Sequence, residues 1–190
     1  AFCARTSDGG RSFRFVSWIV PPADPYRAAM PAVVRHSAGE LVTAVRRREP
    51  GTERCWIDAY RTTDAGQNWS FRGHVANTGG WNGNPPALVI TAGGKLCCAF
   101  GERNTCRMIA KFSTDHGATW GPDFVLRNDF KRDRFEDPDF GYARLVRRAD
   151  GRMVACYYWA TAQLPHQHIA ATIWDPDGSA EPSVPGDAGQ

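Results

Sequence analysis

The sequence is poor in lysine and has no long apolar run. It contains 3 lysines against 20 arginines, and the formal net charge is only +3. The arginines are spread along the whole chain, whereas nucleic-acid-binding domains concentrate basic residues on one face. No stretch of 18 consecutive apolar residues occurs, so no membrane-spanning helix is predicted. We therefore expect neither a nucleic-acid partner nor a membrane partner.

The cysteines form no metal-binding motif. The six of them contain no Cys-x-x-Cys pair, and most lie within apolar stretches. Structural zinc sites use closely spaced pairs of ligands, so free buried thiols are the simpler interpretation. We expect no metal and no cofactor.

One motif returns three times. Its pattern is Ser/Thr-x-Asp-x-Gly-x-x-aromatic, and it occupies residues 6–13, 62–69 and 113–120. The aspartates of the motif are Asp8, Asp64 and Asp115, which are 56 and 51 residues apart. A motif that recurs at such a steady period indicates a repeat architecture.

The segments between the motifs predict strands. Short β-branched and aromatic runs alternate with Gly, Asp and Asn, and no amphipathic helical pattern is present. One unit offers such runs at residues 31–35, 41–45, 55–60 and 69–75. Four short strands per repeat of about 40 to 55 residues are typical of a β-propeller blade. The sequence therefore predicts an all-β propeller.

The repeated aspartates are interpreted as structural. Each is placed in the turn between the third and fourth strands of a unit, where a carboxylate can accept backbone N–H bonds and Gly allows a positive φ. The final aromatic residue is expected to cover the turn and pack in the core. A calcium loop is the alternative, although each motif offers only one carboxylate.

This motif resembles the Asp box, or BNR repeat, of the sialidase (neuraminidase) superfamily, and the resemblance covers residues 1–178. Two longer stretches, 107–122 and 139–176, resemble bacterial sialidase-like proteins. The resemblance implies a six-bladed propeller and favours a secreted or periplasmic bacterial protein.

At about 55 residues a blade, six blades need roughly 330 residues. The 190 residues present are therefore expected to form about three and a half four-stranded blades with thirteen strands, the C-terminal half of a ring. The expected divisions are the end of one blade (1–20), two full blades (21–75 and 76–130), the last blade (131–178) and a flexible tail (179–190). A homo-oligomer could close such a ring.

The functional face should be formed by the second-to-third and blade-to-blade loops. These loops are long, and Arg, Asp, Glu, Trp and Tyr gather in them. Aromatic rings stack on sugars, Arg forks bind carboxylates, and paired carboxylates cleave glycosides. We expect an acidic-glycan site there, with Trp81 and Trp159 as sugar-binding residues.

The resemblance implies roles for particular residues. Tyr142 matches the tyrosine nucleophile of sialidases, which needs a nearby carboxylate to take its proton. Glu136, Asp137 and Asp139, just before it in the chain, are candidates for an acid, a base or a contact to a sugar hydroxyl. Arg46 and Arg103 are the candidates for the arginines that hold a substrate carboxylate, and Arg144 copies a Gly-Tyr-x-Arg pattern of sialidase-like relatives.

The sequence also departs from the family. Met30 stands where the family has the glutamate partner of the nucleophile, and a second family glutamate falls near Tyr158. The first arginine and the acid/base aspartate belong to the N-terminal half of the ring. The expected function is sialidase-like hydrolysis of an acidic glycoside. The alternatives are a non-catalytic carbohydrate- or protein-binding propeller and a polysaccharide lyase.

Overall fold

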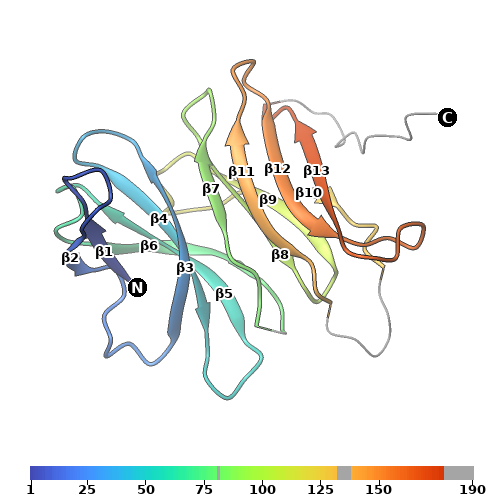
Figure 1. The fold of residues 1–190 in the computed structure, drawn as a ribbon, viewed down its shortest axis with the longest axis horizontal. Coiled ribbons are helices and arrows are strands. Elements are labelled where there is room, and N and C mark those ends of the chain that lie inside the picture. Colours follow the sequence, from blue (N-terminus) through green and yellow to red (C-terminus); the bar gives the residue numbers. More distant parts are fainter. Residues whose placement is uncertain (81, 132–137, 178–190) are drawn as a thin grey trace.

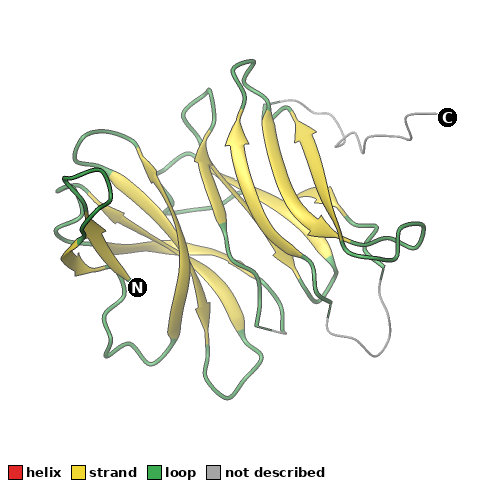
Figure 2. Ribbon diagram, viewed as in Figure 1, coloured by secondary structure: helices red, strands yellow, loops and turns green. Residues whose placement is uncertain are grey.

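The computed structural model describes residues 1–80, 82–131 and 138–177. Every regular element in these residues is a β-strand (Figure 2), which confirms the all-β prediction. No helix in this described part is long and apolar enough to cross a membrane.

The described strands form four antiparallel sheets, each following chain order. The first holds β1 (Phe2–Arg5) and β2 (Arg14–Trp18). The second holds β3 (Arg27–Arg35), β4 (Leu41–Arg48), β5 (Cys55–Thr62) and β6 (Ser70–Asn77). The third holds β7 (Ala87–Ile90), β8 (Leu96–Glu102), β9 (Arg107–Ser113) and β10 (Phe124–Arg127). The fourth holds β11 (Gly141–Arg147), β12 (Met153–Trp159) and β13 (His168–Trp174).

The second, third and fourth sheets lie side by side with their first strands together. β7 contacts both β3 and β11, and the later strands of each sheet fan away from them (Figure 1). The strand grouping of two, four, four and three is the grouping that the sequence predicts. β6 continues to Asn77, past the expected division at residue 75. The tail at 179–190 lies outside the described residues.

The described residues form three buried core clusters between neighbouring sheets. Val42 and Ile57 of the second sheet meet Phe100 and Ile109 of the third in one cluster. Another joins β7–β10 to β11–β13, and the third joins residues 19 and 20 to the second sheet. Burial of each large apolar side chain contributes about 1.5–3 kcal/mol, so face-to-face packing holds the sheets together.

The three aspartate turns share one hydrogen-bond pattern. Asp64 Oδ1 accepts the Thr62 hydroxyl at 2.7 Å and the backbone N–H groups of Gln67 and Asn68 at 2.9 Å each. Asp8 makes all three corresponding bonds in its turn, and Asp115 accepts the Ser113 hydroxyl and the Thr119 N–H in its own. Hydrogen bonds from hydroxyl and N–H groups hold the pKa of all three carboxyls well below the usual range. The aspartates therefore organise their turns.

The aromatic residue of the motif does not always reach the core. Trp69 and Trp120 are partly buried against core clusters, but Phe13 is 66% exposed. The expectation of a packed aromatic is wrong at this turn, because the two described strands beside Phe13 give it too little cover.

Glycine in the third turn allows the second and third sheets to approach. Gly117 has a φ of +86°, and a Cβ atom there would lie 3.2 Å from Ala59 Cβ of β5. The turn after β9 therefore packs directly on the preceding sheet.

Candidate functional site

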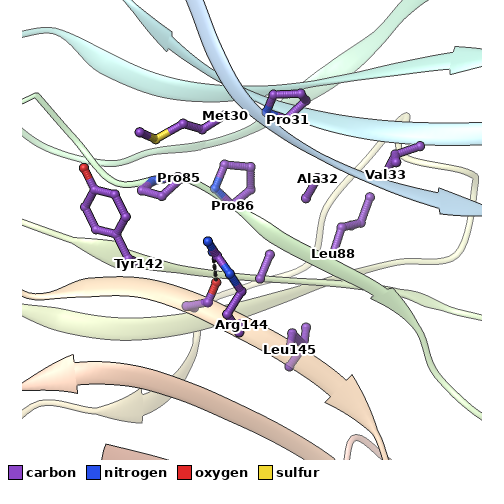
Figure 3. Close-up of a pocket in the computed structure, with 12 residues that line it drawn as sticks. Met30, Pro31, Ala32, Val33, Pro85, Pro86, Leu88, Tyr142, Arg144 and Leu145 are labelled. Atoms are coloured by element: carbon purple, nitrogen blue, oxygen red, sulfur yellow. Dashed lines mark hydrogen bonds between the residues drawn. The ribbon is translucent and has the colours of Figure 1, made fainter. Parts of the chain in front are cut away.

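A cavity of about 510 Å³ opens between the first strands β3, β7 and β11. Met30 and Pro31 line it from β3, Pro85 and Pro86 line it from the segment before β7, and Tyr142 and Arg144 line it from β11 (Figure 3). None of the described residues that line it carries a carboxylate. The cavity thus offers one guanidinium and one phenol among apolar groups.

Two strand irregularities face this cavity. Met30 and Tyr142 have φ values of 50° and 51°, in the left-handed region that non-glycine residues seldom adopt. The pairing of β3 with β4 shifts between Ala29 and Ala32, and that of β11 with β12 shifts between Gly141 and Arg144. Bulges re-aim side chains, and here the Tyr142 ring is directed toward the Met30 side of the cavity (Figure 3).

A polar cluster lies beside Tyr142, centred on Asp139. The Tyr158 hydroxyl donates a hydrogen bond to Asp139 Oδ1, and Gln167 Nε2 donates to Asp139 Oδ2 at 3.0 Å. Arg103 Nη2 lies 3.7 Å from Asp139 Oδ1. The structure therefore brings the predicted Asp139 and Arg103 together.

The protonation states in this cluster follow from those contacts. Burial pulls the pKa of Asp139 upward, but the hydrogen bonds from Tyr158 and Gln167, with the charge of Arg103, leave it below its usual value. Burial and the bond to Asp139 raise the pKa of the Tyr158 phenol. At neutral pH the pair is therefore a carboxylate that accepts a hydrogen bond from a neutral phenol.

Tyr142 of the cavity and Tyr158 of the Asp139 cluster pack against each other. The centroids of Tyr142 and Tyr158 are 5.9 Å apart with an interplanar angle of 37°. Tyr158 is the second position where the resemblance called for a glutamate. The tyrosine there packs its ring against that of Tyr142 and donates its hydroxyl hydrogen bond to Asp139.

Arg144 lines the cavity, and Arg46 lies behind it against the lining residue Met30. Arg144 is exposed on β11, and its Nη1 donates to the Ala143 carbonyl at 3.1 Å. Arg46 lies on β4, where it donates to Met30 Sδ at 3.4 Å and to the carbonyl oxygen of Asn82. Arg103 is 5% exposed, and its Nη2 lies 3.7 Å from Asp139 Oδ1.

Trp159 is not a sugar-binding residue. It is the last residue of β12 rather than part of the following loop, and it is fully buried. Its ring packs against Phe130, Phe140 and Tyr157, and its Nε1 donates to Asp129 Oδ1 at 3.0 Å. The expectation failed because the surrounding aromatic residues form a core around this indole.

Glu136, Asp137 and Trp81 lie outside the described residues. The three motif aspartates lie in turns and do not line the cavity. No group of three or more His, Cys, Asp or Glu among the described residues is arranged to hold a metal ion.

Sequence reasoning missed a buried ionic cluster. Arg47 is 2% exposed, and its Nη2 lies 2.6 Å from Asp24 Oδ1 while its Nε lies 3.7 Å from Asp58 Oδ2. The Trp56 indole also donates to Asp58 at 2.8 Å. The only sequence signal was the run of three arginines at 46–48, of which the middle one turns inward.

No protein-family model matches the chain, and no curated protein sequence is significantly similar to it. Solved structures do share its fold. One is a protein of unknown function from Dyadobacter fermentans, with a TM-score of 0.68 and 22% identity over 90% of this chain and 44% of that one. Another is the α-L-arabinanase of Penicillium chrysogenum complexed with arabinobiose, with a TM-score of 0.65 and 19% identity over 94% and 56%.

A Hadza microbial sialidase is also similar, with a TM-score of 0.56 and 18% identity over 82% of this chain and 36% of that one. The chain spans about half the length of the Dyadobacter fermentans protein and about half the length of the Penicillium chrysogenum arabinanase. The likenesses include arabinanases as well as a sialidase. They establish a β-propeller-like fold shared with glycosidases and do not single out the sialidase family.

Proposed function

We propose that the chain forms part of a glycoside hydrolase that cleaves an acidic sugar in the manner of an exo-α-sialidase, with Tyr142 as the nucleophile. The observation that supports this is a phenol and a guanidinium, Arg144, in one cavity whose described lining has no carboxylate. A neutral nucleophile and a positive lining suit a substrate that is itself negative, because a carboxylate nucleophile would repel it.

The proposed step uses the neighbouring cluster as its base. The Tyr142 oxygen forms a bond to the anomeric carbon, and the glycosidic C–O bond breaks with its electron pair on the departing oxygen. The Tyr142 proton passes to the Tyr158 oxygen, and the Tyr158 proton passes to Asp139. Water then attacks the anomeric carbon, and the bond from that carbon to the Tyr142 oxygen breaks with its electron pair on the oxygen. Asp139 returns its proton to Tyr158, Tyr158 returns its own to Tyr142, and the attacking water gives one proton to the departed oxyanion.

The test is an assay of this 190-residue chain with two aryl glycosides, an α-sialoside and an α-L-arabinofuranoside. Aryl leaving groups depart as stabilised anions, so the assay places little demand on an acid catalyst. Hydrolysis of the sialoside supports the proposal. Hydrolysis of the arabinofuranoside alone would keep a glycoside hydrolase but overturn the acidic substrate.

Tyr142→Phe removes the reactive hydroxyl and should lower the rate at least about a hundredfold. Tyr26→Phe is the matched control, because the Tyr26 ring packs edge-on against Trp56 at 5.1 Å, in another part of the molecule. Equal rates for wild type and Tyr142→Phe would overturn the nucleophile assignment.

A non-catalytic carbohydrate-binding protein is the second candidate, and Met30 favours it. The side chain that faces Tyr142 across the cavity has no charge and cannot take a proton. This candidate predicts that calorimetry with sialyllactose and arabinobiose detects binding while both aryl glycosides remain intact. A lyase would instead release an unsaturated uronate that absorbs in the near ultraviolet.

A further inference from the structure

Asn84 is fully buried at the end of the segment between β6 and β7, directly before Pro85. Its Nδ2 donates to the Phe140 carbonyl oxygen at 3.1 Å, and its Oδ1 accepts the Tyr142 backbone N–H at 3.1 Å. The two bonded groups flank Gly141 on either side. One side chain therefore clamps the backbone at the start of β11, which lies far along the chain from it.

The clamp depends on two glycines. A Cβ atom on Gly141 would lie 2.3 Å from Asn84 Oδ1, and a Cβ atom on Gly101 of β8 would lie 2.7 Å from Asn84 Nδ2. Real Cβ atoms do not approach so closely, so the carboxamide occupies space that only glycine leaves open. Three separate segments thus meet around this amide.

The conformation that the clamp holds is unfavourable for tyrosine. Tyr142 has a φ of 51°, and a non-glycine residue stays in the left-handed region only where the surrounding structure enforces it. Loss of the amide would leave the Phe140 carbonyl and the Tyr142 N–H without this partner. The backbone would then gain by returning to the extended region, and that return would turn the ring out of its present direction.

We propose that Asn84 is a positioning residue of the site, whose carboxamide enforces the left-handed conformation of Tyr142 and so aims the phenol into the cavity. The consequence for catalysis rests on the proposed function of Tyr142. The conformational consequence does not, and the experiment measures it directly.

The experiment compares Asn84→Ala and Asn84→Asp in the full chain by NMR. The three-bond HN–Hα coupling and the Cβ chemical shift of Tyr142 report its φ without any ligand. Thr172→Val is the matched control, because Thr172 is 3% exposed in the same sheet and its hydroxyl bonds to the Tyr157 hydroxyl at 2.5 Å. It removes a buried hydrogen bond without touching Tyr142.

The Asn84→Asp variant supplies a pH-dependent readout. The protonated carboxyl of this variant matches the amide, since its hydroxyl can donate to Phe140 and its carbonyl can accept from Tyr142. The ionised form keeps the acceptor but faces the Phe140 oxygen with negative charge, which raises the pKa of that carboxyl. The Tyr142 signals should therefore be like wild type at low pH and shift as the group ionises.

The expected result is an extended φ for Tyr142 in Asn84→Ala, a pH-dependent φ in Asn84→Asp, and an unchanged φ in Thr172→Val. A wild-type coupling in Asn84→Ala, or the same shift in the control, would overturn the proposal. If Asn84→Ala does not fold, the titration of Asn84→Asp decides alone, and a flat profile refutes it. If wild type cleaves no glycoside but the φ values change as expected, the proposed function fails while the role of Asn84 stands.

Discussion

Arg46 directs its guanidinium at the sulfur of Met30, with 3.4 Å between Nη1 and Sδ. A thioether sulfur is a weak hydrogen-bond acceptor, so this contact stabilises the arginine side chain only slightly. A carboxylate at the same position would form an ion pair and would face Tyr142. Position 30 thus places an uncharged thioether across the cavity from Tyr142.

Met30→Glu should therefore raise the hydrolysis of an aryl sialoside about tenfold or more, because a well-placed base contributes roughly 10²–10⁴ in rate. Steady-state kinetics measures this. Met30→Gln is the control, since it has similar length and no charge, and it should leave the rate unchanged. Equal rates for the two variants would show that position 30 does not act on Tyr142.

The aspartate turns should differ in their contribution to stability. Asp115→Ala removes a carboxylate that binds the hydroxyl and N–H of Thr119 in a turn packed on β5. Asp8→Ala makes the same change in an exposed turn of the two-stranded sheet. Calorimetric melting should show a fall of several degrees for Asp115→Ala and a smaller one for Asp8→Ala. The reverse order would mean that the contact with β5 adds nothing.

Acid should destabilise the protein through these same turns. The pKa of each motif carboxyl is lower in the folded chain than in the unfolded chain, so below about pH 4 the unfolded chain binds more protons. The ionised carboxylates contribute their full stabilisation above the pKa that these groups have in the unfolded chain. This stabilisation is lost as the pH falls through the pKa that they have in the folded chain. Melting temperatures between about pH 7 and about pH 2 should thus drop most steeply at the acid end. Asp64→Asn should flatten that drop, and a drop as steep as that of wild type would assign it to other groups.

Removal of the buried Arg47 guanidinium should lower the free energy of unfolding. Arg47→Ala leaves Asp24 and Asp58 without their partner in a region of low exposure, and breaking a buried pair costs about 3–5 kcal/mol. Arg54→Ala is the comparison, because Arg54 is largely exposed and lies 3.9 Å from Glu49, and exposed pairs contribute at most about 1 kcal/mol. Urea unfolding measures both free energies. A loss below about 1 kcal/mol for Arg47→Ala would show that water replaces the guanidinium.

The sequence predicted most strands because their signals are local. The expected strands at residues 31–35 and 55–60 lie within β3 and β5, where apolar residues fill most of the run. Expected ends were less accurate where polar residues continue a strand. β4 extends through three arginines to Arg48, because each of them pairs with a residue of β5.

The site was harder to predict because its contacts join distant segments. Tyr142 was chosen through a resemblance alone. In the structure it lines a cavity, at a register shift of β11. Trp159 was misassigned because two of the residues that bury it, Phe130 and Phe140, come from segments well before it in the chain. Asn84 carried a faint signal at most, an Asn before two prolines, since its partners are 56 and 58 residues away.

The two hydrogen bonds of the Asn84 carboxamide limit how repeats can be exchanged between such proteins. A repeat protein invites the exchange of whole repeats, yet Tyr142 sits on one sheet while the side chain that sets its backbone comes from the segment before another. A chimera that imports β11–β13 alone would separate the tyrosine from its clamp. The smallest transferable unit of the clamp therefore runs from Asn84 through β11 and crosses the boundary between two repeats.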